Sequence, residues 1–290
     1  MKLMILGADG MLGHQLVQSY RGKHETVGTY RKSGPEYASI TPYLADHCHY
    51  GIEAADFDVL GELIATVKPA AVINAIGIVK QRAEAKELIA SIEINALLPH
   101  KLAVFCQDVG SRLVHLSTDC VFSGRRGRYQ ESDFADADDV YGRTKLLGEA
   151  AGPGSLTLRT SIIGLELSRK KSLIEWYLAQ KGSIQGFRNA IYSGFTTLEM
   201  ARIIDMLLDQ HPDASGLYHL SSAPIDKCEL LVQLNDRLGK PVEITENLDF
   251  HCERSLLSER FRADFNYTPP AWPVMLDELA TQIKERYQWT

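Results

Sequence analysis

The chain has 290 residues, of which 45% are hydrophobic and 23% charged, the composition of an ordinary globular protein. Its formal net charge of −6 (31 Lys and Arg against 37 Asp and Glu) argues against broad electrostatic attraction to nucleic acid or to an anionic membrane. No apolar run close to the roughly 20 residues of a membrane span is evident, no signal peptide precedes the first strand, and the five cysteines are scattered without a CxxC pair. We therefore expect a reduced, cytoplasmic protein that binds neither nucleic acid nor membrane and holds no metal.

The predicted elements alternate between strand and helix through the first half of the chain. We expect strands at Lys2–Leu6, Thr26–Tyr30, Ala71–Asn74, Arg112–Ser117 and Leu156–Thr160. We expect helices at Met11–Tyr20, Phe57–Val67, Ala83–Val109 (broken near Pro99), Leu173–Lys181, Thr197–Gln210, Lys227–Leu238 and Val274–Tyr287. This order predicts an α/β fold, a Rossmann-type doubly wound parallel sheet. Residues 1–160 would form the NADP(H)-binding domain with the catalytic residues, and residues 161–290 a smaller, mixed C-terminal substrate-binding lobe whose strands could return to the sheet.

A glycine-rich turn follows the first predicted strand. Gly7-Ala8-Asp9-Gly10-Met11-Leu12-Gly13 has the spacing G-x-x-G-x-x-G. A dinucleotide pyrophosphate needs a tight turn, backbone that it can approach without meeting Cβ atoms, and the amides of a helix N-terminus. Gly7, Gly10 and Gly13 meet these needs, although a plain strand–turn–helix can carry the same pattern.

The end of the second predicted strand selects between the two nicotinamide cofactors. An acidic residue there would hold the ribose 2′-OH of NAD, whereas a basic residue would accept the 2′-phosphate of NADP. The chain places Arg31 and Lys32 at this point, followed by Ser33, with no carboxylate. We therefore predict NADPH as the cofactor. NADH is left open, and a solvated basic turn is the alternative interpretation.

A Tyr-x-x-x-Lys pair, Tyr141 and Lys145, would lie on one face of a helix. Tyrosine has an ordinary pKa near 10, which a neighbouring ammonium would lower toward the neutral range that proton transfer needs. The spacing alone is common by chance, but this pair follows a strand that ends in Ser117 and Thr118. Those hydroxyls would lie at the carboxyl edge of the sheet, where ligands of open α/β folds bind.

Together these motifs resemble the extended short-chain dehydrogenases/reductases, and within them the dTDP-4-dehydrorhamnose reductase family. The segments that carry the resemblance are the glycine turn, Asn74-Ala75, Ser117-Thr118-Asp119-Cys120-Val121-Phe122-Ser123-Gly124, Tyr141-Gly142-Arg143-Thr144-Lys145 with Gly148-Glu149, and Leu158-Arg159-Thr160-Ser161. The family signature S-T-D-Y-V-F-x-G is nearly reproduced, with Cys120 in place of its tyrosine, and Ile162 stands where the family has a tryptophan. These departures concern the identity of the sugar rather than the reductase chemistry.

The resemblance implies a role for each position. Thr118 would hydrogen-bond the sugar carbonyl, Tyr141 would donate the proton, and Lys145 would orient the ribose and tune Tyr141. Cofactor contacts would come from Gly10, Met11 and Leu12 at the pyrophosphate, Asp56 and Phe57 at the adenine, and Ala75, Ile76 and Gly77 at the ribose. Thr118, Asp119 and Ile162 would contact the substrate.

Three further segments have two interpretations each. Arg188, in the aromatic and glycine-rich stretch 186–197, could pair with a substrate diphosphate or belong to a packed turn. Asn95 could bracket the active-site helix or serve as a cap. His47-Cys48-His49 invites a metal interpretation, but no second group of ligands is apparent, so we expect no metal site.

These observations favour NADPH-dependent reduction of the keto group of a nucleotide-linked 4-keto-6-deoxysugar, in deoxysugar and cell-surface polysaccharide biosynthesis. A nucleotide-sugar dehydratase or epimerase is the nearest rival, but dehydratases carry two acids after the threonine, and Cys120 stands at the second position. A non-catalytic NADP-binding regulatory subunit is a further alternative, which the retained tyrosine and lysine disfavour. The identity of the nucleotide and sugar, and the choice between monomer and homodimer, are left open.

Overall fold

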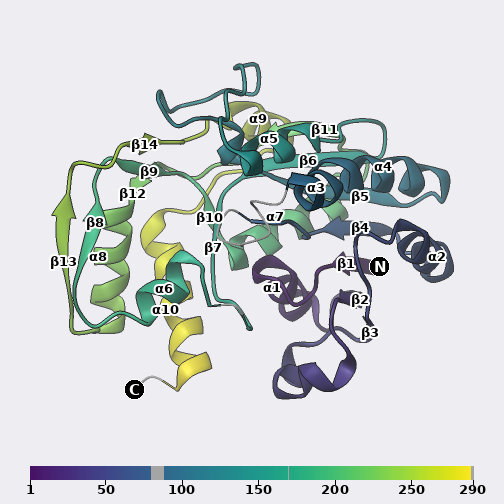
Figure 1. Cartoon of the computed structure of the whole chain (residues 1–290), viewed down its shortest axis with the longest axis horizontal. Helices are drawn as coiled ribbons and strands as arrows, with labels where there is room; N and C mark the ends of the chain where they lie inside the picture. The colour runs from purple at the N-terminus through teal and green to yellow at the C-terminus, as the bar shows by residue number, and fades with distance from the viewer. Residues whose placement is uncertain (80–87, 169, 289–290) are drawn as a thin grey trace.

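A seven-stranded, all-parallel sheet forms the centre of the computed structural model, which describes residues 1–79, 88–168 and 170–288 (Figure 1). The strand order is β11-β6-β5-β4-β1-β2-β3, so the predicted doubly wound sheet is confirmed. The direction of winding reverses between β1 and β4, where folds of this type bind their ligands. The strands are β1 (Lys2–Leu6), β2 (Glu25–Tyr30), β3 (His47–Tyr50), β4 (Ala71–Asn74), β5 (Arg112–Thr118), β6 (Ser155–Thr160) and β11 (Gly216–His219).

Helices cover both faces of this sheet because its strands are apolar on both sides. In β1, Leu3 and Ile5 belong to one hydrophobic cluster while Met4 and Leu6 belong to another. The first cluster contains α1 (Met11–Tyr20) and α7 (Thr197–Gln210), and the second contains α2 (Phe57–Val67) and α4 (Leu98–Asp108). A 3₁₀ segment, η1 (Gly34–Tyr43), connects β2 to β3. The sheet is therefore buried between two helical layers.

The helix predicted over 83–109 differs from expectation at two points. Residues 83–87 lie outside the described part of the chain, and from α3 (Leu88–Ser91) the helix runs through a π-helical turn, η3 (Ile92–Leu97), into α4. Pro99 does not break it, because proline stands in the first turn of α4, where no backbone N–H is needed.

This helix also corrects the expectation that no apolar run is long enough to cross a membrane. The helical stretch Leu88–Asp108 has 21 residues, and an 18-residue window within it has a mean hydropathy of 1.4, so that by length and composition alone it could cross a membrane. Leu98, Leu102 and Cys106 on this stretch are buried in the second hydrophobic cluster. These contacts are those of a helix that covers one face of a sheet.

The second half of the chain builds a smaller group of strands and helices beside the carboxyl end of the sheet (Figure 1). β8 pairs in parallel with β13, β9 pairs with β12 and β14, and β7 pairs with β10. The bounds are β7 (Ile162–Ile163), α6 (Leu173–Leu178), β8 (Gly182–Phe187), β9 (Ala190–Tyr192), β10 (Phe195–Thr196), β12 (Ile225–Asp226), α8 (Lys227–Leu238), β13 (Val242–Asn247), β14 (Cys252–Glu253), α9 (Glu259–Phe265) and α10 (Trp272–Tyr287).

Two elements of this second half belong to the central sheet and its helical layers. β11 extends the sheet beyond β6, and α7 packs against α1. The Tyr20 hydroxyl on α1 donates a hydrogen bond of 3.0 Å to the carbonyl of Ala201 on α7. The division into two lobes near residue 160 stays a prediction, since these segments cross it.

Candidate active site

The glycine turn joins β1 to α1 at the switch point of the sheet. Gly7 has a φ of +75°, a conformation that favours glycine, and its N–H donates to the hydroxyl of Thr29 on β2 (3.1 Å). A Cβ on Gly13 would collide with the carbonyl oxygen of Gly7, so only glycine lets α1 start this close to the turn. No side chain caps the first turn of α1. Its amides and positive end therefore face the position where an anion would be held.

Arg31 and Lys32 directly follow β2, and both side chains are exposed to solvent. The Lys32 ammonium lies 3.7 Å from the Glu36 carboxylate, and no ion pair of Arg31 is found among the described residues. The Tyr37 hydroxyl accepts a hydrogen bond from the Lys32 backbone N–H (3.2 Å) and donates one to the carboxylate of Asp9 (3.1 Å). Burial and the nearby Asp9 raise the pKa of Tyr37 to about 12.

Asp9 and Tyr37 are therefore additions to the residues expected at this edge. Asp9 stands inside the glycine turn, so its position in the motif could have identified it. No sequence pattern indicates Tyr37, because it comes from the unpredicted segment η1.

The remaining expected cofactor contacts lie in two segments, one after β4 and one at the start of α2. The Ala75 N–H donates to the Leu6 carbonyl (3.2 Å), and a Cβ built on Gly7 would lie 3.0 Å from the side chain of Ile76. The structure thus brings the segment 75–77 to the glycine turn. In contrast, the Asp56 carboxylate caps α2 by accepting from the Val59 N–H (3.3 Å). The Phe57 ring packs edge-on against Phe105 at 5.8 Å. An adenine role for Asp56 and Phe57 stays a prediction, and their observed contacts belong to the fold.

Asn95 lies in the π-helical turn and connects two parts of the site. Its side-chain oxygen accepts from the Ile78 N–H (2.9 Å), and its amide nitrogen donates to the Ile78 carbonyl (3.0 Å) and to the Thr144 hydroxyl (3.2 Å). The fully buried amide thus ties the segment after β4 to α5 (Val140–Leu147). Of the two interpretations of Asn95, the bracket is the one that its contacts match.

Two close contacts set the start of α5, which carries Tyr141 and Lys145. The Asp139 carboxylate accepts from the Gly142 N–H (2.8 Å) and caps the helix. A Cβ on Gly142 would collide with the carbonyl oxygen of Cys120 in η4 (Asp119–Val121). Glycine therefore permits α5 to pack directly on the segment that follows β5.

This packing places the Tyr141 phenol near the side chain of Thr118, which acts on the pKa of the phenol. The Thr118 hydroxyl also donates to the Asp119 carboxylate (3.2 Å) and accepts from the Cys120 N–H (3.1 Å). Thr118 lies at the carboxyl end of β5. The structure therefore brings together the predicted proton donor and the predicted carbonyl-binding hydroxyl.

The electrostatics of Tyr141 differ from the expectation that Lys145 lowers its pKa. Burial raises the pKa of Tyr141 above its ordinary value, and Cys120 and Asp119 raise it further, while Thr118 opposes them. Lys145 is directed elsewhere, because its ammonium donates to the carbonyl of Leu116 (2.6 Å). Burial lowers the pKa of Lys145 to about 8, against the opposing effect of Glu149. Lys145 is not among the main causes of the shift in the pKa of Tyr141.

The expected substrate contacts Asp119 and Ile162 lie in different surroundings. Asp119 is buried beside Thr118, and burial raises the pKa of its carboxyl while the Arg254 guanidinium opposes the rise. Ile162 is half-buried in β7, where it pairs with Phe195 of β10. Arg254, which donates to the carbonyl of Phe122 (2.9 Å), has no local motif that could have indicated it.

Arg188 has internal partners, and its role toward a substrate diphosphate stays a prediction. Its guanidinium donates to Glu246 (2.9 and 2.5 Å) and to Asp226 (3.2 Å), and these carboxylates raise its pKa. Two internal carboxylates thus occupy the donors that a diphosphate would need, and the contacts match the packed-turn interpretation.

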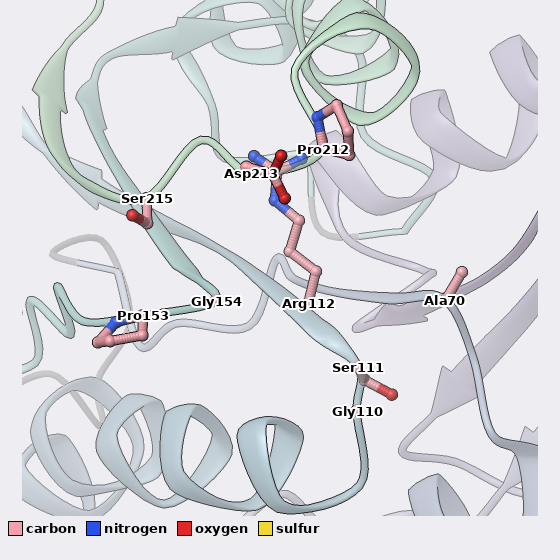
Figure 2. Close-up of a pocket in the computed structure, with 9 residues that line it drawn as sticks. All are labelled: Ala70, Gly110, Ser111, Arg112, Pro153, Gly154, Pro212, Asp213 and Ser215. Atoms are coloured by element: carbon pink, nitrogen blue, oxygen red, sulfur yellow. The ribbon is translucent and has the colours of Figure 1, made fainter.

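A hollow of about 400 Å³ lies at the opposite, amino edge of the sheet (Figure 2). Figure 2 shows the Arg112 side chain reaching toward Pro212 and Asp213 across it. The Arg112 guanidinium donates to the carbonyls of Leu207 (2.8 Å) and Ala214 (2.9 Å). The hollow is therefore separate from the catalytic cluster, and its arginine holds the end of α7.

Comparisons with known proteins agree with this geometry. A family model described as RmlD substrate binding domain matches residues 1–225. A dTDP-4-dehydrorhamnose reductase of Salmonella typhimurium is 26% identical over an alignment of 312 positions, gaps included, that covers 98% of each chain. A probable low-salt glycan biosynthesis reductase, Agl14, of Haloferax volcanii is 30% identical over 169 residues, covering 56% of this chain and 54% of that protein.

A solved structure shares the fold at low sequence identity. The dTDP-4-dehydrorhamnose reductase of Bacillus anthracis, solved in complex with NADP, has a TM-score of 0.78 and 20% identity. The similarity covers 97% of this chain and 99% of that structure.

Proposed function

This chain belongs to the RmlD substrate binding domain family of extended short-chain dehydrogenases/reductases, and we propose that it is an NADPH-dependent reductase. Its substrate would be a nucleotide-linked 4-keto-6-deoxysugar, in deoxysugar or glycan biosynthesis, as the names of the relatives suggest. The observation that carries the proposal is the meeting of two elements: α5, which holds Tyr141 and Lys145, packs at the carboxyl end of β5, where Thr118 lies.

The residues present fit a dinucleotide. Gly7 and Gly13 provide a turn that a Cβ at position 13 would block, and the first turn of α1 has no side-chain cap. Arg31 and Lys32 are exposed at the end of β2, where a 2′-phosphate would be held. Bound NADPH would supply the hydride that the carbonyl carbon receives.

The chain's own residues would handle the carbonyl oxygen. The Thr118 hydroxyl would donate a hydrogen bond to it and stabilise the negative charge that develops. The raised pKa of Tyr141 means that the phenol carries its proton at neutral pH and can give it to the nascent alkoxide. Lys145, anchored on the Leu116 carbonyl, would hold the ribose. The product is then the alcohol, with one hydride on carbon and one proton on oxygen.

The rival activities are less well supported. A dehydratase needs a second acid after the threonine, but burial and Asp119 raise the pKa of the Cys120 thiol to about 12, so it remains a neutral thiol. A regulatory subunit would not need the Tyr141 and Lys145 pair that α5 carries at the carboxyl end of β5.

The experiment is to follow NADPH and NADH oxidation with dTDP-, UDP-, GDP- and CDP-linked keto sugars. Tyr141→Phe should lower kcat by about 10²–10⁴-fold and leave NADPH affinity nearly unchanged, because the ring keeps its packing and loses only the proton. Oxidation with no member of the panel would contradict the proposed class of substrate. Near-normal turnover by Tyr141→Phe would contradict the assignment of the proton donor.

A further inference from the structure

A buried histidine, His115, lies on β5 of the central sheet and contacts Lys145 of α5. It is completely buried, and its Nε2 lies 3.4 Å from the Lys145 Nζ. Its other ring nitrogen, Nδ1, lies 3.1 Å from the side-chain nitrogen of Asn74 on β4. His115 is not one of the expected site residues. Among the hydrogen bonds of the described residues, it is nevertheless the only side chain that contacts the Lys145 amine.

The contacts of Asn74 determine which atom of its amide faces the imidazole. The Asn74 oxygen accepts a hydrogen bond of 3.1 Å from the backbone N–H of Ile76. The remaining amide atom is therefore the NH₂ group, which can only donate. It follows that the Nδ1 of His115 accepts this hydrogen bond, and that the proton of the neutral ring is assigned to Nε2.

This assignment places two donors in front of each other. The Nε2–H of His115 points at Lys145, whose ammonium has no lone pair, whereas a neutral amine could accept the hydrogen bond. The Leu116 carbonyl satisfies the lysine on its other side at 2.6 Å. The carbonyl accepts from either form and favours the ammonium, whereas the Nε2–H of His115 faces the amine with a donor and favours the neutral form.

We propose that His115 is a positioning residue for Lys145: Asn74 holds its imidazole in the Nε2–H tautomer, which favours release of a proton from the lysine. The inference rests on the proposed reductase function for its role in turnover. Burial lowers the pKa of Lys145 to about 8, against the opposing effect of Glu149, so that the amine can release a proton near neutral pH. The hydrogen bond from His115 would act in the same direction as burial.

The other titratable groups around this pair come from three elements. Tyr141 and Glu149 flank Lys145 on or just after α5, and Glu149 raises the pKa of the lysine. Arg159 on β6 neutralises Glu149 through a bidentate pair at 2.7 and 2.6 Å. His100 on α4 acts with Lys145 and burial to lower the pKa of His115. His115 therefore stays neutral while Lys145 titrates.

The test measures tautomer and titration directly by NMR on the full chain. With ¹⁵N-labelled histidine, His115 should show a protonated Nε2 and an unprotonated Nδ1. With ¹³Cε-labelled lysine, assigned by Lys145→Arg, the midpoint of Lys145 should lie near 8. His115→Leu should raise this midpoint by about one pH unit, a tenfold change in the ratio of amine to ammonium.

Two further variants keep the test decisive. Asn74→Asp offers His115 an acceptor, so the proton should move to Nδ1 and the Lys145 midpoint should rise even if His115→Leu fails to fold. His14→Gln removes another buried, neutral histidine and should leave the midpoint unchanged. A protonated Nδ1 in the unmodified chain, or an unchanged midpoint in both position-115 and position-74 variants, would overturn the proposal. These readouts do not depend on turnover, so they are distinct from failure of the substrate panel.

Discussion

The buried ion pair behind the catalytic helix gives the sharpest prediction about stability. Arg159 and Glu149 are joined by two hydrogen bonds of 2.7 and 2.6 Å, and their side chains are only 7% and 6% exposed. Ser117 on β5 donates to the same carboxylate at 2.6 Å. Glu149→Gln would leave the guanidinium buried without a countercharge, which costs about 3–5 kcal/mol in the free energy of unfolding.

Urea denaturation measures this loss, and an exposed pair supplies the matched control. Arg237 and Asp277 are also 2.6 Å apart, but the aspartate side chain is 67% exposed, so Asp277→Asn should cost less than about 1 kcal/mol. Replacing the buried pair together, by Glu149→Leu with Arg159→Met, should recover most of the loss. Equal effects of Glu149→Gln and Asp277→Asn would refute the claim that burial decides the cost.

Three further outcomes follow from the structure. Arg31→Ala with Lys32→Ala should raise the KM for NADPH far more than that for NADH, since each charge-assisted hydrogen bond to a 2′-phosphate is worth roughly 1.5–3 kcal/mol; equal effects would make these residues a solvated turn. Arg188→Ala should leave inhibition by free nucleoside diphosphates unchanged, because Glu246 and Asp226 already occupy the guanidinium, and weaker inhibition would restore it to the binding site. Burial lowers the pKa values of His14 and His219 to about 4, so both stay neutral in the folded protein while the same residues take up protons in the unfolded chain. Stability measured by thermal unfolding should therefore fall as the pH drops from about 6.5 to 4. His14→Gln should make this dependence of stability on pH less steep.

Local patterns predicted the sheet well because each strand and helix is specified by its own residues. Helices α2, α7 and α8 begin and end where the apolar spacing predicts, and the glycine turn joins the first strand to the first helix as its motif predicts. The η1 segment and the short strands β8 to β14 escaped prediction. Their apolar residues pack against partners far away in the sequence, which no window of neighbouring residues can reveal.

The same distinction between local and distant contacts applies to the candidate active site. Residues on one element, such as Thr118 at the end of β5 or the Tyr141–Lys145 pair on α5, could be placed from their spacing alone. Contacts between elements could not: Arg254 reaches the Phe122 carbonyl across 132 positions of sequence, and Arg188 finds Glu246 across 58. Neither contact could be predicted from neighbouring residues, and for Arg188 no local pattern indicated its two carboxylate partners.

The chemistry of Lys145 shows why spacing is not enough to assign electrostatics. A separation of four residues places Tyr141 and Lys145 on one face of α5, and from this the sequence argument expected the ammonium to act on the phenol. The sheet competes for the same amine, because β5 offers the Leu116 carbonyl at 2.6 Å and the His115 ring at 3.4 Å. Those contacts are set by how close α5 approaches β5, which depends on the absence of a side chain at Gly142. Gly142, beside the tyrosine, therefore helps determine which groups the Lys145 amine contacts. Gly142→Ala should displace the start of α5 and with it the contacts of Lys145 with Leu116 and His115.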